Sequence, residues 1–172
     1  MRSIGAVAFA ALALTSAAAA QGAKPNDAQI AHIAYTADQI DIDAAKLALQ
    51  KSKNKEVRDF AENMVRDHTA VNDQALALVK KLNVTPQDND TSKALVKQAD
   101  AKQAELKKLE GGAFDKAYAD NEVAYHKAVN NALETVLIPN ASNTDLKDLL
   151  ETGLKIFQGH EQHAEQVAQS LK

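Results

Sequence analysis

The sequence predicts an all-α protein built as an up-and-down four-helix bundle with one additional short helix. Helix-forming residues such as Ala, Leu, Lys and Gln fill four long segments in which apolar residues recur every three or four positions. No segment shows the strict alternation of apolar and polar residues that is typical of strands. All three Pro residues stand in stretches that separate or precede the four long segments.

The first two long helices are expected to pair with each other. The first should run from about Asp27, with Asn26 as its polar cap, to about Lys51. The second should run from about Lys55 to about Leu82, and its last turns carry basic residues that suit the negative end of a helix dipole. Because only a few residues connect the two helices, they must be antiparallel neighbours.

A longer connection should then carry the chain back along the bundle. Pro86 marks a loop, and a shorter helix is expected from about Ser92 to about Leu109. The pair Gly111–Gly112 should end it, and we expect the second glycine of the pair to adopt positive φ. The third and fourth long helices should span about 113–137 and about 144–171. A crossover between the second and third long helices is the topology of ferritin-like folds.

The first twenty residues have the pattern of a secretory signal peptide. Arg2 precedes an apolar run from Ile4 to Thr15, and small residues end in an Ala-x-Ala cleavage site at Ala18–Ala20. The apolar run is too short to span a bilayer, which takes roughly 20 residues. We therefore expect residues 1–20 to be removed, residues 21–172 to form one periplasmic domain, and no transmembrane segment to remain.

Composition restricts the partners and the metal ligands. The formal net charge is -3 and no basic stripe is present, so we expect no nucleic-acid binding, which depends on Lys and Arg at the phosphates. The chain has no Cys, so a transition metal would have to be bound by His, Asp or Glu. The sequence leaves the oligomeric state open.

Polar residues recur on the apolar faces of all four long helices. His68 falls within the arc formed by Met64, Val71 and Ala75, where another apolar residue would be expected. Five such inward-facing residues are Asp41, His68, Glu122, His126 and His160. One hypothesis is a core metal site for a Zn, Cu or Fe ion. The other is a set of interhelical hydrogen bonds, such as one between His68 and Asp41, that fixes how the helices pair.

The spacing of these residues disfavours di-iron chemistry. A di-iron bundle uses Glu-x-x-His on two helices, because residues three apart aim both ligands inward. None of the five His has Glu three positions before it, and the nearest substitute is Glu122 with His126 at i, i+4. We therefore do not expect ferroxidase or dioxygen chemistry. The sequence assigns no catalytic and no cofactor-binding residue, and it favours a binding protein over an enzyme without deciding between them.

Three segments resemble the DUF4142 family of exported bacterial proteins, which are often labelled as outer membrane proteins. They are DIDAAKLAL (41–49), FAENMVRDH (60–68) and LEGGAFDKAY (109–118), followed by two single His positions. The resemblance implies a ferritin-like fold without an assigned activity. It also implies an acidic residue at Asp41 and recurrent histidines at His68, His126 and His160.

The sequence thus predicts an exported, periplasmic, ferritin-like bundle. We expect a non-enzymatic binding or stress-associated envelope protein with a His/Asp metal site in its core. One alternative is a dinuclear-metal oxidase or a metal-storage protein. A further alternative is a lipid-associating protein at the periphery of the envelope, because Ala-rich amphipathic helices are compatible with lipid surfaces.

Overall fold

The structure is a computed structural model that describes residues 24–171. The predicted signal peptide therefore lies outside the described residues. Within the described range the secondary structure is helical and contains no strand, which confirms the all-α prediction. The long helices are α1 (Asp27–Lys51), α2 (Lys55–Lys81), α4 (Gly111–Ala132) and α6 (Thr144–Ser170), and the shorter α3 (Asp90–Leu106) lies between α2 and α4.

Asparagine side chains cap four of these helices. Asn26, Asn54, Asn89 and Asn143 precede α1, α2, α3 and α6, and each side chain accepts a hydrogen bond from a backbone N–H of the first turn. Such a cap is worth about 0.5–2 kcal/mol because it satisfies a donor that the helix itself cannot. The helix starts therefore lie within two residues of the positions that the sequence predicts.

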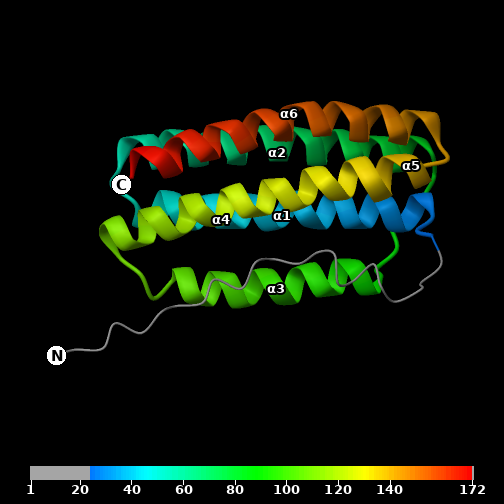
Figure 1. The fold of residues 1–172 in the computed structure, drawn as a ribbon. Helices are drawn as coiled ribbons and strands as arrows, with labels where there is room; N and C mark the ends of the chain where they lie inside the picture. Colours follow the sequence, from blue (N-terminus) through cyan, green and yellow to red (C-terminus); the bar gives the residue numbers. More distant parts are fainter. Residues whose placement is uncertain (1–23, 172) are drawn as a thin grey trace.

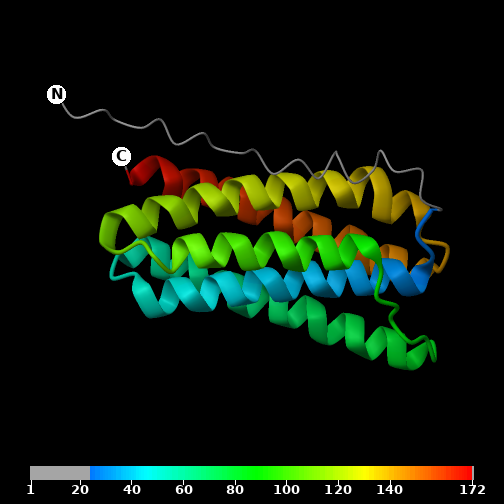
Figure 2. The same cartoon turned by 90° about the horizontal axis from the view of Figure 1, so that it is seen from below.

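The four long helices form the bundle, and α3 crosses along its outside (Figures 1 and 2). Helix α1 packs most extensively on α2, and α4 on α6, while α2 also packs on α6 and α3 covers α1. Figure 1 shows the α1–α2 turn and the turn before α6 at opposite ends of the bundle. This arrangement is the predicted bundle with a crossover helix between its second and third long helices.

The last predicted turn of the third long helix is π-helical, and the helix continues past its predicted end to Asn140. This turn, η2 (Leu133–Leu137), leads into α5 (Ile138–Asn140), and the N–H of Ile138 donates to the carbonyl of Leu133, five residues back. Pro139 explains the wider turn, because a proline inside an α-helix lacks an N–H and its ring clashes with the carbonyl four residues before it.

The glycine break before α4 differs from the prediction in one detail. Gly111, not Gly112, adopts positive φ, at 55°. Gly112 lies inside the first turn of α4, where an added Cβ would meet nothing within 4 Å. The positive φ is therefore needed one residue earlier, at the first residue of the helix.

The apolar core falls into two halves along the bundle. The packed half lies toward the α1–α2 turn and includes Phe60, Met64, Phe114 and Tyr118, all fully buried. The cavity half lies toward the start of α6 and surrounds a cavity of about 740 Å³. Its buried residues are Ile30, Ile33, Ala37, Val71, Leu95, Leu133, Leu137, Leu146, Leu150 and Phe157. Among the helices of residues 24–171, none is long and apolar enough to span a membrane.

Candidate metal centre

The five predicted polar residues meet at mid-length of the bundle, between the two halves of the core. Each lies ten to fifteen residues from the end of its helix on the side of the α1–α2 turn. All five are buried, with exposed fractions of 0–7%. They are Asp41 on α1, His68 on α2, Glu122 and His126 on α4, and His160 on α6. All four long helices therefore contribute a side chain to this group at mid-length of the bundle.

Three imidazoles form the centre of this group. His68, His126 and His160 can each offer one ring nitrogen, and these atoms lie within 4.8 Å of one another. The rings of His68 and His126 are 5.7 Å apart between centroids, and those of His68 and His160 are 5.2 Å apart. Three nitrogens at this separation could bind a single ion placed between them.

The other nitrogen of each imidazole is held by a hydrogen-bonding group outside the cluster. Nδ1 of His68 lies 2.8 Å from Oδ1 of Asp38, and Nε2 of His160 lies 3.0 Å from Oδ2 of Asp67. Nδ1 of His126 donates to the backbone carbonyl of Glu122 at 3.0 Å. Carboxylates and carbonyls hold metal-binding histidines in this way, fixing both the tautomer and the ring orientation.

The nitrogens that remain point into the cluster without a satisfied hydrogen bond. Nε2 of His126 and Nδ1 of His160 are buried and have no hydrogen-bond partner among the described residues. Nε2 of His68 lies 2.6 Å from Oδ2 of Asp41, but the contact lacks hydrogen-bond geometry. Buried polar atoms nearly always have a hydrogen-bond partner, so two nitrogens that lack one and face the same point are unusual.

Asp41 adds a fourth donor to the three imidazoles. Its Oδ2 lies 2.6 Å from Nε2 of His68 and 3.4 Å from Nε2 of His126. Neither of its carboxylate oxygens has a hydrogen bond that satisfies normal geometry. Asp41 also belongs to a second group of three, with Glu122 and His126, whose ligand atoms lie within 4.8 Å of one another.

Burial and the neighbouring carboxylates shift the pKa values of the groups in the centre. Burial alone would lower the pKa of His68, but the charge of Asp41 and the hydrogen bond with Asp38 raise it to about 10. Burial lowers the pKa of His160 to about 4, with a further contribution from the charge of His68. Burial also raises the pKa of Glu122 well above its usual range, assisted by the charge of Asp41. Without a metal, the neighbouring carboxylates therefore favour the protonated form of His68, and burial favours the neutral forms of Glu122 and His160.

The family model of the domain of unknown function DUF4142 matches residues 12–167. The chain belongs to the DUF4142 family. No curated protein matches its sequence. Among solved structures, the chain is similar to CopM in the Cu(II)-bound form, at 18% sequence identity and a TM-score of 0.63. The similarity covers 85% of this chain and 98% of CopM. At this identity the likeness shows a shared helical fold.

Two residues that contact His68 were missed by sequence reasoning. Asp38, only 4% exposed, binds the outer nitrogen of His68. It lies three residues before Asp41, and this i, i+3 spacing on one helix face was the signal that could have revealed it. Phe157 stacks on His68 with ring centroids 4.5 Å apart. Helical spacing back from His160 allows either Ile156 or Phe157 on the inward face of α6, and the structure buries Phe157.

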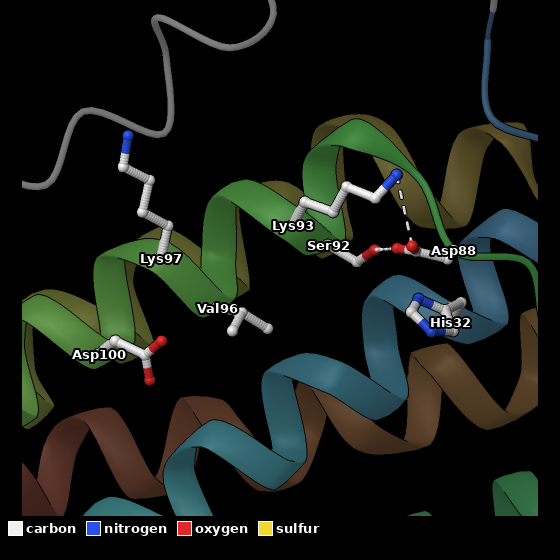
Figure 3. Close-up of a pocket in the computed structure, with 7 residues that line it drawn as sticks. All are labelled: His32, Asp88, Ser92, Lys93, Val96, Lys97 and Asp100. Atoms are coloured by element: carbon white, nitrogen blue, oxygen red, sulfur yellow. Dashed lines mark hydrogen bonds and ion pairs between the residues drawn. The ribbon is translucent and has the colours of Figure 1, made fainter.

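The two remaining histidines lie outside the centre. His32, on α1, borders a shallow pocket of about 430 Å³ beside the start of α3 (Figure 3). In that pocket Asp88 accepts a hydrogen bond from Ser92 and pairs with Lys93. The ring of His163 packs edge-on against Phe60 in the packed half. Neither residue belongs to a metal-ligating group among the described residues.

Proposed function

We propose that this protein binds one divalent transition-metal ion through His68, His126, His160 and Asp41. The observation that carries the proposal is the pair of buried ring nitrogens on His126 and His160 that lack partners and face His68. Leaving two such groups unpaired costs about 1–3 kcal/mol each, and a bound ion would remove that cost. The hydrogen bonds to the opposite nitrogens would hold each ring in its ligating orientation.

A purely structural role explains fewer of the contacts. Hydrogen bonding between α1 and α2 accounts for His68, which contacts Asp38 and Asp41. It does not account for His126 and His160, whose inward nitrogens bond to nothing among the described residues. In a hydrogen-bond network that specifies helix pairing, every buried polar group is expected to have a partner, because each group without one is destabilising. A single metal ion would bind all of the inward-facing nitrogen and oxygen atoms at once.

Cu(II) is the ion that we favour. Imidazole nitrogens suit copper, zinc, iron and nickel, and copper binds most tightly to a given set of nitrogen and oxygen ligands. The fold shared with CopM, which binds Cu(II) in the similar structure, is consistent with this choice. The signal-peptide pattern supports action in the periplasm, where the bundle would meet the ion after export.

The donor set supports binding or buffering of the ion rather than catalysis. Three imidazoles and one carboxylate would supply four protein ligands, whereas catalytic sites keep one position for water or substrate. His68 and His126 are at most 2% exposed, so solvent has little access to the ion from their sides. The protein would therefore sequester the ion within the bundle.

Calorimetric titration of the metal-free mature chain with Cu(II) or Zn(II) tests the proposal. We expect one ion per chain, and we expect His126→Leu to abolish stoichiometric binding. His32→Leu is the matched control and should bind as the wild type does, because His32 lies outside the centre. Circular dichroism should show that both variants remain folded. Saturable binding no tighter than about 100 μM, roughly 5.5 kcal/mol, or unchanged binding by the His126 variant, would overturn the proposal.

A dinuclear centre is the second candidate, and it rests on the group formed by Asp41, Glu122 and His126. His126 limits this possibility, because its Nδ1 is bonded to the Glu122 carbonyl and only Nε2 can bind an ion. A second ion would then depend mainly on carboxylate oxygens. The same titration separates the candidates, since a dinuclear storage or oxidase centre requires two ions per chain and loses one in Glu122→Gln.

A further inference from the structure

The cavity half contains a long apolar chamber that the metal proposal does not use. Its volume is about 740 Å³, within the range of roughly 300–1,000 Å³ that is typical of small-molecule sites. The space is partly open to solvent, and apolar side chains line most of it, so it suits an apolar ligand. Its apolar walls come chiefly from Ile33, Val71, Leu133, Leu137, Leu146, Leu150 and Phe157.

The chamber is elongated along the bundle. On α1 its lining extends from Gln29 to Asp38, a rise of roughly 14 Å for nine residues of helix. On α6 it extends from Leu146 to Phe157, roughly 16 Å by the same rise per residue. Phe157 closes the inner end, where its other face stacks on His68. A linear apolar ligand fits this shape better than a compact one.

Polar residues lie at the opposite end from Phe157. Lys24 lines the chamber there, exposed to solvent, beside Asn89, Asp90 and Thr91 at the start of α3. Helix α3 has seventeen residues, and its N-terminus carries the positive end of a helix dipole. Lys24 and this helix end favour a negatively charged head group, although Asp90 opposes it in part.

The π-helical turn lies in the wall of the chamber. Leu133, Thr135, Val136 and Leu137 of η2 all line the chamber. π-Helical turns are rare and are found frequently at functional sites. Here the turn widens the helix at the wall of the chamber, so the irregular backbone and the unfilled volume coincide.

We propose that the chamber binds a free fatty acid, with its hydrocarbon chain between α1, α2, η2 and α6 and its carboxylate near Lys24. The chain would end against Phe157, on the far side of the ring from His68. The chamber contains none of the four proposed metal ligands, although Asp38 and Phe157 line it and also contact His68. The occupant explains the aliphatic lining, the length of the chamber and the cation at its open end.

Titration of the metal-free mature protein with laurate, followed by calorimetry, tests this proposal. We expect one laurate per chain. Ala75→Leu and Ala37→Leu place extra side-chain volume in the chamber from two different helices, and each should weaken laurate binding at least tenfold. Ala70→Leu is the matched control on α2, because Ala70 is exposed and lies outside the lining. Two filling variants keep the test decisive if one of them fails to fold.

The head group has its own test. Lys24→Gln should weaken laurate binding by about two- to fivefold, as expected for an exposed ion pair, and should leave the affinity for dodecanol unchanged. Lys53→Gln removes a comparable exposed charge outside the chamber and should change neither affinity. Absence of saturable laurate binding, or equal binding by the filling variants, would overturn the proposal. Extraction of intact diacyl lipid from phosphatidylglycerol vesicles, without laurate binding, would overturn the assignment to a free fatty acid.

Discussion

The two halves of the core share α1, α2 and α6, yet among the described residues the large apolar chamber lies in the cavity half. The packed half contains Phe60, Phe114 and Tyr118, whose rings contact one another and are fully buried. The cavity half has mainly aliphatic side chains and a single buried aromatic residue, Phe157. The difference is one of side-chain volume, because three large aromatic rings fill the packed half and the cavity half has one.

The candidate metal centre lies at the boundary and contacts both halves. On the packed side, Tyr118 is fully buried one helical turn before Glu122. On the cavity side, Phe157 stacks on His68 and lines the chamber. One side of the centre is therefore held by close packing, whereas the other adjoins open space. The following predictions test this asymmetry.

The largest expected effect is the loss of an aromatic ring from the packed half. Phe60→Ala should lower the free energy of unfolding by about 3–5 kcal/mol, because it leaves a void in a fully packed region. Phe157→Ala is the matched change in the cavity half and should cost only about 2 kcal/mol, since that ring already borders open space and has fewer contacts to lose. Urea denaturation measures both values. Equal losses would mean that the two halves are packed alike in solution.

Metal binding should stabilise the boundary between the halves. At a free ion concentration of a hundred times the dissociation constant, a ligand that binds only the folded chain adds about 2.7 kcal/mol to the free energy of unfolding. The increase should appear in urea denaturation with Cu(II) and should be absent in His126→Leu. Native-state hydrogen exchange should show the greatest added protection around His68 and His160, on either side of the centre. Protection confined to the packed half would place the ion elsewhere.

The sequence was sufficient to predict the helices and the five inward polar residues, because both follow from a 3.6-residue period. Their meeting point could not be predicted, since it depends on which ends of the bundle hold the two turns. The sequence left this open, and the turns lie at opposite ends. Asp38 was missed because its partner is on another helix, thirty residues away. The chamber was missed because unfilled volume has no signature in a linear pattern of apolar residues.

Adding volume should have opposite effects in the two halves. Ala119→Leu inserts a larger side chain where Ala119 is 1% exposed in the packed half, and overpacking there should cost about 1–3 kcal/mol. Ala75→Leu extends into the chamber and should raise the free energy of unfolding by up to about 1 kcal/mol through added apolar burial. Thermal and urea denaturation of the two variants check the sign. Destabilisation by both would show that the chamber has collapsed in solution.

The smallest expected effect concerns the end of the cavity half, where Asp27 joins α1 to the turn before α6. Its carboxylate accepts hydrogen bonds from the N–H and Oγ of Ser142 and from the N–H of Asn143. Burial raises the pKa of Asp27, but these hydrogen bonds outweigh it and hold the pKa below the ordinary value of 3.8. A carboxyl whose pKa is depressed on folding stabilises the protein above the unfolded-state pKa and loses that contribution as the pH falls through its folded-state value.

Asp27→Asn should therefore lower the free energy of unfolding by less than about 1 kcal/mol at neutral pH, since solvent screens much of the interaction. The difference from the wild type should shrink below pH of about 4, where the wild-type carboxyl also becomes neutral. Urea denaturation from pH 7 down to pH 3 measures this dependence. Lys81→Gln, which removes an exposed ion pair with Asp145 at the same end, is the control and should cost no more than the Asp27 variant. If the effect of Asp27→Asn is the same at both pH values, the hydrogen-bonded carboxylate does not contribute to closing this end of the bundle, and the cavity half depends on its apolar walls alone.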